Sequence, residues 1–111
     1  MSSPDWTLLS NHGHVLVALA QDPDARIREI ATEVGITERA VQAILADLCA
    51  AGYVGRERRG RRNHYHLDLG LPMRHPLERG HVVGELLEAI GDVAPGATSA
   101  GSRERPLESD G

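Results

Sequence analysis

Five arginines surround one glycine in the middle of this 111-residue chain and form its densest group of ionic side chains. They are Arg56, Arg58, Arg59, Arg61 and Arg62, on both sides of Gly60. Like charges so close together repel one another, and bound phosphate groups would relieve that repulsion. The cluster therefore favours an anion-contacting turn over the alternative, a solvated turn without a ligand.

A second group of polar side chains precedes this cluster, on a predicted helix over residues 37–51. The apolar residues of that helix recur at helical spacing and predict its buried side: Val41, Ile44, Leu45 and Leu48. The opposite side, which we name the reading face, carries Glu38, Arg39, Gln42, Ala43 and Ala46. Arginine can bind O6 and N7 of guanine, glutamine can pair with N6 and N7 of adenine, and alanine can contact the thymine methyl group. The simpler alternative is that Arg39 contacts only phosphate.

The formal net charge of −4 argues weakly against a nucleic-acid partner, so the distribution of charge decides more than its total. Residues 35–66 contain six arginines and three acidic residues, a net charge of +3, which leaves −7 for the remainder. The basic part of the molecule is therefore concentrated in the middle of the sequence. Glu38 and Asp47 are exceptions within it, because carboxylates repel phosphates unless one of them accepts from a cytosine amino group.

Three short helical patterns precede the arginine cluster. They span residues 11–21, 28–34 and 37–51. Ser10 and Thr37 suit the N-caps of the first and third helices, and Gly35 follows the second helix, where glycine readily adopts a left-handed conformation. Arg26 stands where a capping serine or threonine is expected, so the cap does not define where the second helix begins.

The arginine cluster belongs to a predicted β-hairpin with its turn at Gly60. After the turn, Tyr65, Leu67 and Leu69 alternate with the polar residues His64, His66 and Asp68. A fourth helix is predicted over about 76–91, after Pro72 and Pro76. Residues 92–111 contain too little apolar surface to fold, so we expect a folded domain over 1–91 and a disordered tail over 92–111.

The second and third helices have the spacing of a helix-turn-helix, with Ala31 at the close approach, Gly35 in the turn and Val41 sealing the core. With a hairpin directly after the third helix, residues 10–90 resemble the winged helix-turn-helix transcriptional regulators of the broad MarR and ArsR kind. The resemblance implies an α+β, mainly α fold with a three-helix core, a two-stranded wing and a C-terminal dimerisation helix. The ArsR cysteine motif is missing and the MarR dimerisation helices are much shortened, which weakens any expectation of metal or drug sensing.

The resemblance implies binding of double-stranded DNA, with helix 37–51 in the major groove and wing 55–63 on the backbone or in the minor groove. The implied DNA-contacting residues are Thr37, Glu38, Arg39, Gln42, Ala43, Arg56, Arg58, Arg59, Arg61, Arg62 and His64. Regulators of this type usually read two half-sites as a symmetric dimer, so a homodimeric repressor is expected. The expected dimer interface consists of Trp6, Leu9, Leu77, Val83, Leu86, Leu87 and Ile90.

Other classes of function have less support in the sequence. No nucleophile with an evident base, no phosphate loop and no paired carboxylates indicate an enzyme, so we expect no catalytic residue and no cofactor. The histidines lack a third ligand that the sequence could place, and we expect no metal site. No segment predicts a membrane helix or a signal peptide, so a cytoplasmic, nucleoid-associated protein is expected. The main alternative is a winged-helix adaptor that binds protein without reading DNA, and whether a small-molecule effector exists is left open.

Overall fold

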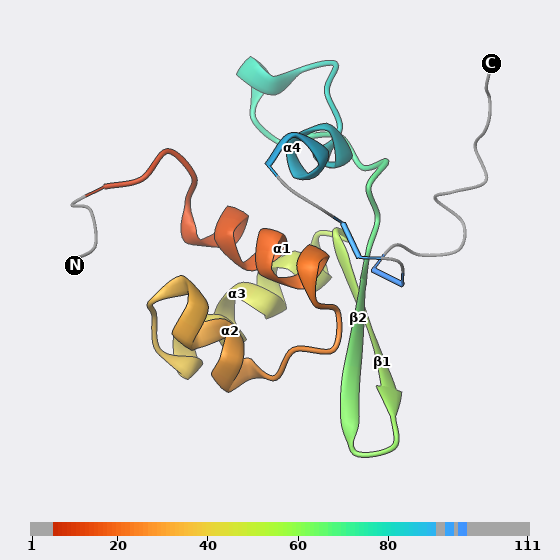
Figure 1. The fold of residues 1–111 in the computed structure, drawn as a ribbon. Helices are drawn as coiled ribbons and strands as arrows, with labels where there is room; N and C mark the ends of the chain where they lie inside the picture. Colours follow the sequence, from red (N-terminus) through yellow and green to blue (C-terminus); the bar gives the residue numbers. More distant parts are fainter. Residues whose placement is uncertain (1–5, 91–92, 95, 98–111) are drawn as a thin grey trace.

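The computed structural model describes residues 6–90, 93, 94, 96 and 97 (Figure 1). Its elements are α1 (Asn11–Gln21), α2 (Ile27–Val34), α3 (Glu38–Ala50), β1 (Val54–Arg59), β2 (Arg62–Leu67), the 3-10 helix η1 (Pro76–Glu78) and α4 (Val83–Ile90). This order is that of a three-helix core followed by a hairpin, so the predicted mainly α fold with a wing is confirmed.

The helices α1, α2 and α3 pack around one apolar core. Val15, Leu19, Ile30 and Val41 are fully inaccessible to solvent and fill its centre. Ser10 caps α1 by accepting a hydrogen bond from the Gly13 amide, as predicted. The start of α2 is stabilised differently, because the Glu29 carboxylate accepts from the Arg26 amide at 2.9 Å. A glutamate at the third helical position therefore takes the place of the missing N-cap side chain.

The hairpin extends away from the helices, with the turn between its strands at the far end (Figure 1). Its strands pair antiparallel with Val54 opposite Leu67 and Arg59 opposite Arg62. Tyr65 and Leu67, each 1% exposed, attach the base of the hairpin to the core. The outer edge of β2 is also covered, since the Tyr65 amide donates to the Pro23 carbonyl at 2.8 Å and the Leu67 amide donates to the Ala97 carbonyl at 2.6 Å.

The predicted fourth helix over 76–91 is wrong in its first half. Residues 76–78 form a single 3-10 turn, and the α-helix begins only at Val83. Between them Gly80 has a φ of 87°, a left-handed conformation that ends helical structure. The next residues run alongside 71–73, where the Met73 amide donates to the His81 carbonyl at 2.9 Å and Val82 bridges to Pro72.

Residues 93, 94, 96 and 97 differ from the expectation of an unstructured tail beginning at residue 92. The Ala94 amide donates to the Ala20 carbonyl at 2.7 Å, and Ala97 is fully buried. Small apolar side chains fit this narrow position against α1 and β2, where composition alone predicts no structure. We name the described residues Val93, Ala94, Gly96 and Ala97 the C-terminal segment. Most of the predicted tail, residues 92, 95 and 98–111, lies outside the described residues.

Candidate nucleic-acid interface

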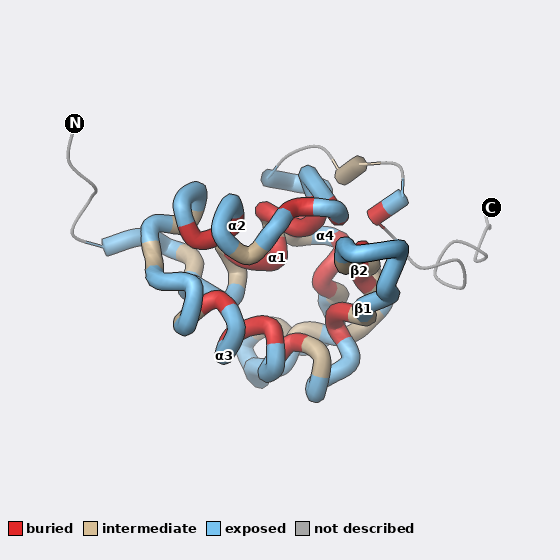
Figure 2. The backbone as a smooth tube through the Cα atoms, turned by 90° about the horizontal axis from the view of Figure 1, so that it is seen from below, coloured by how far each residue is buried: buried red, intermediate tan, exposed pale blue. Residues whose placement is uncertain are grey.

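The two sides of α3 differ completely in exposure, as the sequence predicts. The apolar side is buried in the core: Val41, Ile44, Leu45 and Leu48. All members of the reading face are exposed: Glu38, Arg39, Gln42, Ala43 and Ala46. Figure 2 shows the buried side of α3 turned toward the middle of the molecule and the exposed side turned outward. The helix therefore presents a row of exposed side chains, while its opposite side packs against the core and holds the helix in place.

The joint between α2 and α3 determines how far α3 projects from the core. Gly35 adopts a φ of 87° and its amide donates to the Ala31 carbonyl at 2.8 Å, which ends α2. Two residues later Thr37 caps α3, because its hydroxyl accepts from the Ala40 amide at 3.0 Å. Thr37 therefore has a structural role at the first turn of the reading face, beside any contact it makes with a ligand.

The hairpin arginines divide between the two faces of the sheet. Cross-strand partners share a face, so Arg56, opposite Tyr65, and Arg58, opposite Asn63, lie on the face that packs on the core. Arg59 and Arg62 lie opposite each other on the other face. All five arginines are exposed, but Arg59 contacts the Glu57 carboxylate at 3.3 Å and Arg62 donates to the Asp24 carbonyl at 2.6 Å. Arg56 and Arg61 have no side-chain bond among the described residues.

A hollow of about 240 Å³ connects the hairpin with α3. Gln42 and Ala46 of the reading face line it together with Cys49, and Arg56 closes it from β1. The structure thus brings the predicted base-reading residues and the base of the hairpin onto one continuous surface. Cys49 is half-buried there, consistent with the small packing residue that the sequence indicates.

His64 does not belong to this surface, and its expected role as a DNA contact does not fit the structure. It is 6% exposed, and its two ring nitrogens lie 2.7 Å from Asp24 Oδ1 and 3.0 Å from the Gly96 carbonyl oxygen. The alternation of β2 predicts its face correctly, but the C-terminal segment and the loop after α1 cover that face. A hydrogen bond from His64 is the main reason that the pKa of Asp24 lies below its ordinary value, with Arg59 and Arg62 adding to the effect.

The structure shows the positions of two further residues, Arg26 and Asp47, which the sequence alone does not predict. Arg26 lines a hollow of about 280 Å³ with Arg61 and Arg62, so it adds a cation to the side of the hairpin. Asp47 lies on the flank of α3 that faces α1, where its carboxylate is 2.8 Å from His12 Nε2. Asp47, one of the two acidic residues that would repel a nearby phosphate, is therefore paired, and it lies outside the reading face.

The expected dimer-interface residues fall into three groups: buried, exposed and half-buried. Val83 and Leu87 are each 3% exposed because they pack into the chain's own core, so they are not available to a partner. Trp6, Leu77 and Ile90 are 73%, 90% and 44% exposed, and Leu8 is 92% exposed. Leu9 and Leu86 are half-buried. An apolar stripe does not reveal which of its members face the core when the helix is short.

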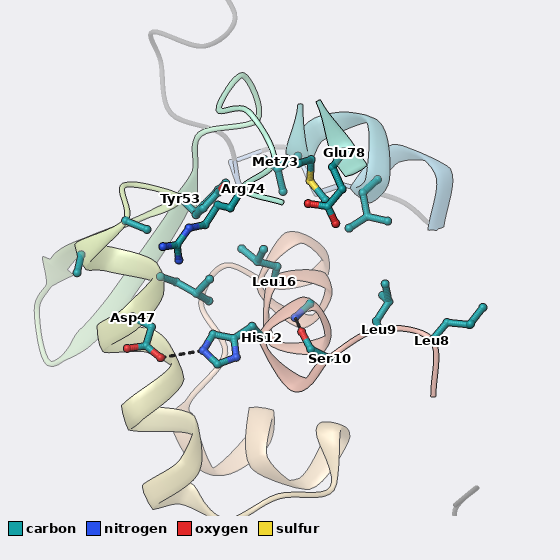
Figure 3. Close-up of a pocket in the computed structure, with 16 residues that line it drawn as sticks. Leu8, Leu9, Ser10, His12, Leu16, Asp47, Tyr53, Met73, Arg74 and Glu78 are labelled. Atoms are coloured by element: carbon teal, nitrogen blue, oxygen red, sulfur yellow. Dashed lines mark hydrogen bonds and ion pairs between the residues drawn. The ribbon is translucent and has the colours of Figure 1, made fainter. Parts of the chain in front are cut away.

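A large hollow lies away from the reading face, between the N-terminal arm (residues 6–10), α1, the end of α3 and η1 (Figure 3). It measures about 720 Å³ and is mainly apolar, with Leu16, Tyr53 and Met73 among its lining residues. The His12–Asp47 pair marks its edge. Leu8 and Leu9 lie at its other side (Figure 3).

Two kinds of site are not found in the part of the chain that the structure describes. No group of three or more histidine, cysteine, aspartate or glutamate side chains there is close enough together to hold a metal ion. Within the same residues, no helix combines the length and apolar character that crossing a membrane requires.

Part of the chain is similar to known proteins. Residues 8–54 match the family model described as winged helix-turn-helix DNA-binding. Among solved structures, MepR, a transcription regulator of the Staphylococcus aureus multidrug efflux pump MepA, is similar with a TM-score of 0.49 and 22% identity. The similarity covers 72% of this chain and 53% of that chain, so this chain spans about half the length of MepR. No curated protein matches the chain. The matched residues run from three residues before α1 to the first residue of β1, so the part of the chain that contains α1, α2 and α3 is similar to winged helix-turn-helix DNA-binding domains.

Proposed function

We propose that this protein is a sequence-specific regulator of transcription that binds double-stranded DNA as a homodimer, of the broad MarR and ArsR kind, and acts as a repressor. Helix α3 enters the major groove with its reading face, and the hairpin arginines contact the backbone or the minor groove. The observation that carries the proposal is the continuous surface formed by the reading face and the hairpin, joined at Gln42, Ala46 and Arg56.

The charges around that surface support a nucleic-acid ligand. Arg39, Arg56 and Arg61 are exposed on or beside it, and Arg26 extends the positive charge along the hairpin. Of the nearby carboxylates, Asp47 is paired with His12 and Glu57 with Arg59, which leaves Glu38 as the acid of α3 that has no side-chain partner among the described residues. Glu38 can accept from the N4 amino group of cytosine, so it is compatible with a groove contact.

The homodimer is proposed to form through the apolar residues that the core leaves exposed. These are Trp6 and Leu8 on the N-terminal arm, Leu77 on η1 and Ile90 on α4. Leu9 and Leu86 line the large hollow beneath them, so a second chain would cover this side of the molecule. Exposed apolar side chains in one region are typical of an interaction surface.

Light scattering tests this placement of the dimer. Leu77→Glu combined with Ile90→Glu introduces four buried carboxylates into a symmetric interface, so the variant is expected to be monomeric. Gln21→Glu, which adds a carboxylate to an exposed position at the end of α1, is the control and should leave the mass unchanged. A double variant that keeps the wild-type dimeric mass would show that the interface lies elsewhere.

A mobility-shift experiment at two salt concentrations tests the DNA-binding proposal as a whole. Duplexes enriched from a random pool should bind more tightly than scrambled duplexes, and both affinities should fall steeply as salt rises. Absence of any retained duplex at low salt would contradict the proposal and favour the adaptor function, in which the same domain contacts protein. Reporter expression with the enriched duplex upstream then distinguishes a repressor from an activator.

A further inference from the structure

The buried ring of His64 connects three parts of the chain that are far apart in sequence. It lies on β2, its Nδ1 is 2.7 Å from Asp24 Oδ1 in the loop between α1 and α2, and its Nε2 is 3.0 Å from the Gly96 carbonyl oxygen. The ring is 6% exposed, so water has little access to its nitrogens. Its hydrogen bonding therefore has to be satisfied by these two oxygens.

Both oxygens can only accept hydrogen bonds. A neutral imidazole has one N–H group and one lone pair, whereas the imidazolium ion has an N–H group at each nitrogen. Only the imidazolium form can donate to Asp24 and to Gly96 at the same time. In the neutral form one nitrogen presents its lone pair to an oxygen lone pair, and the contact becomes repulsive.

Deprotonation is expected to break the bond to Gly96 and to keep the bond to Asp24. The carboxylate is charged, and a charge-assisted hydrogen bond is stronger than a bond to a neutral carbonyl group. Asp24 is also fixed from its other end, because its own carbonyl oxygen accepts from Arg62 Nη2 at 2.6 Å. The remaining proton therefore stays on Nδ1, and the Nε2 lone pair faces the C-terminal segment.

The other charged groups around the ring are Asp24, Glu57, Arg59, Arg62 and His66. Glu57 is the cross-strand partner of His64, and His66 lies on the same face of β2. Arg59 and Arg62 lower the pKa of Asp24, which keeps this carboxylate ionised beside the ring. The described residues of the C-terminal segment contain no ionisable side chain, so a pH dependence of their contact with the ring has to come from His64.

We propose that His64 is a proton-dependent clasp that fastens the C-terminal segment to β2 and α1 when doubly protonated and releases it when neutral. Histidine is the side chain whose unperturbed form changes its charge between about pH 5 and 8, which is why a histidine can serve as such a clasp. Release breaks the bonds from Leu67 to Ala97 and from Ala94 to Ala20 and uncovers the outer edge of β2 at Leu67, while the bond from Tyr65 to Pro23 remains. The device does not depend on DNA binding.

Nuclear magnetic resonance on the full chain between pH 5 and 9 tests the clasp. The ring nitrogens of His64 should both carry protons at the acidic end, and Nε2 should lose its proton as the pH rises. Over the same range the hydrogen-exchange protection of the Leu67 amide, corrected for intrinsic rates, should fall about tenfold, which corresponds to the net contribution of one hydrogen bond. The Tyr65 amide, bonded to Pro23, should keep its protection because the Asp24 bond remains.

Variants make the result specific to His64. In His66→Gln the pH dependence of the Leu67 amide should persist, whereas in His64→Gln it should disappear. If His64→Gln does not fold, Asp24→Asn replaces it: without the carboxylate the imidazolium form is less stable, so the Leu67 transition should move to lower pH. Leu67 protection that stays constant while His64 titrates, or a transition unmoved in Asp24→Asn, would overturn the proposal.

Discussion

The reading face of α3 and the hairpin are both exposed, yet they present opposite kinds of chemistry. The reading face has one arginine among five positions and is attached to a helix whose other side is buried in the core. The hairpin has five arginines and is attached to the core mainly through Tyr65 and Leu67 at its base. A rigid support with varied side chains suits the reading of base edges, while a cationic extension suits phosphate. Substitutions in the two regions should therefore change DNA binding in different ways.

The largest expected loss of stability comes from truncating a buried side chain of α3. Leu45 is 3% exposed and packs into the core, so Leu45→Ala should lower the free energy of unfolding by about 2–5 kcal/mol. On the same helix, Gln42→Ala should change it by less than about 0.5 kcal/mol, because the side chain is exposed. Urea unfolding of both variants measures the difference. Equal losses would show that α3 does not have one structural side and one free side.

The joint before α3 should be the next most sensitive position. At Gly35 an added Cβ meets no atom within 4 Å, so any cost of Gly35→Ala comes from its φ of 87°. A left-handed conformation costs an alanine about 1–2 kcal/mol, and stability should fall by that amount. Gly60, with a φ of 64° in the hairpin turn, is the matched control: its alanine variant should show a similar strain without affecting α3. Stability unchanged in Gly35→Ala would show that the turn relaxes to another geometry.

The hydrogen bond between His64 and Asp24 should have a smaller effect on stability, and this effect should depend on pH. The pKa of Asp24 is lowered below its ordinary 3.8, chiefly by the hydrogen bond from His64. A lowered folded-state pKa means that the ionised carboxylate stabilises the fold above pH 3.8, and that this contribution is lost as the pH falls through the folded-state value. Asp24→Asn should therefore be less stable than wild type near pH 6, and the two should converge as the pH falls through the lowered folded-state pKa of Asp24. A difference that persists into strong acid would mean that the charge is not the cause.

The sequence predicts the core and the surface of this protein with unequal success. The helical spacing of Val41, Ile44 and Leu48 predicts the buried side of α3, because burial follows periodicity when a helix packs on one core. Gly35 predicts the joint for a similar local reason. His64 is different, since its burial comes from residues 30 to 40 positions away, and no local pattern reports such a contact.

The C-terminal half shows a limit of predicting helices from the spacing of apolar residues. A stripe of apolar residues over 77–90 suggested one continuous helix, but Gly80 and the pairing of 71–73 with 81–83 divide it. Val83 and Leu87 then enter the core, while Leu77 is left exposed. The packing partners of a short segment decide its structure here, and they cannot be read from the segment itself.

The division of roles between α3 and the hairpin is tested most directly by binding isotherms over a range of salt, on an enriched duplex and on its scrambled counterpart. Gln42→Ala should cost about 1–3 kcal/mol on the enriched duplex, with little loss on the scrambled one and an unchanged salt slope. Arg58→Ala and Arg61→Ala should each weaken both duplexes alike and reduce the slope of log affinity against log salt by about 0.9. Arg79→Ala, an exposed arginine after η1, and Gln21→Ala are the matched controls and should change neither quantity. The account is contradicted if Gln42→Ala weakens both duplexes equally, or if the hairpin variants leave the salt slope at its wild-type value.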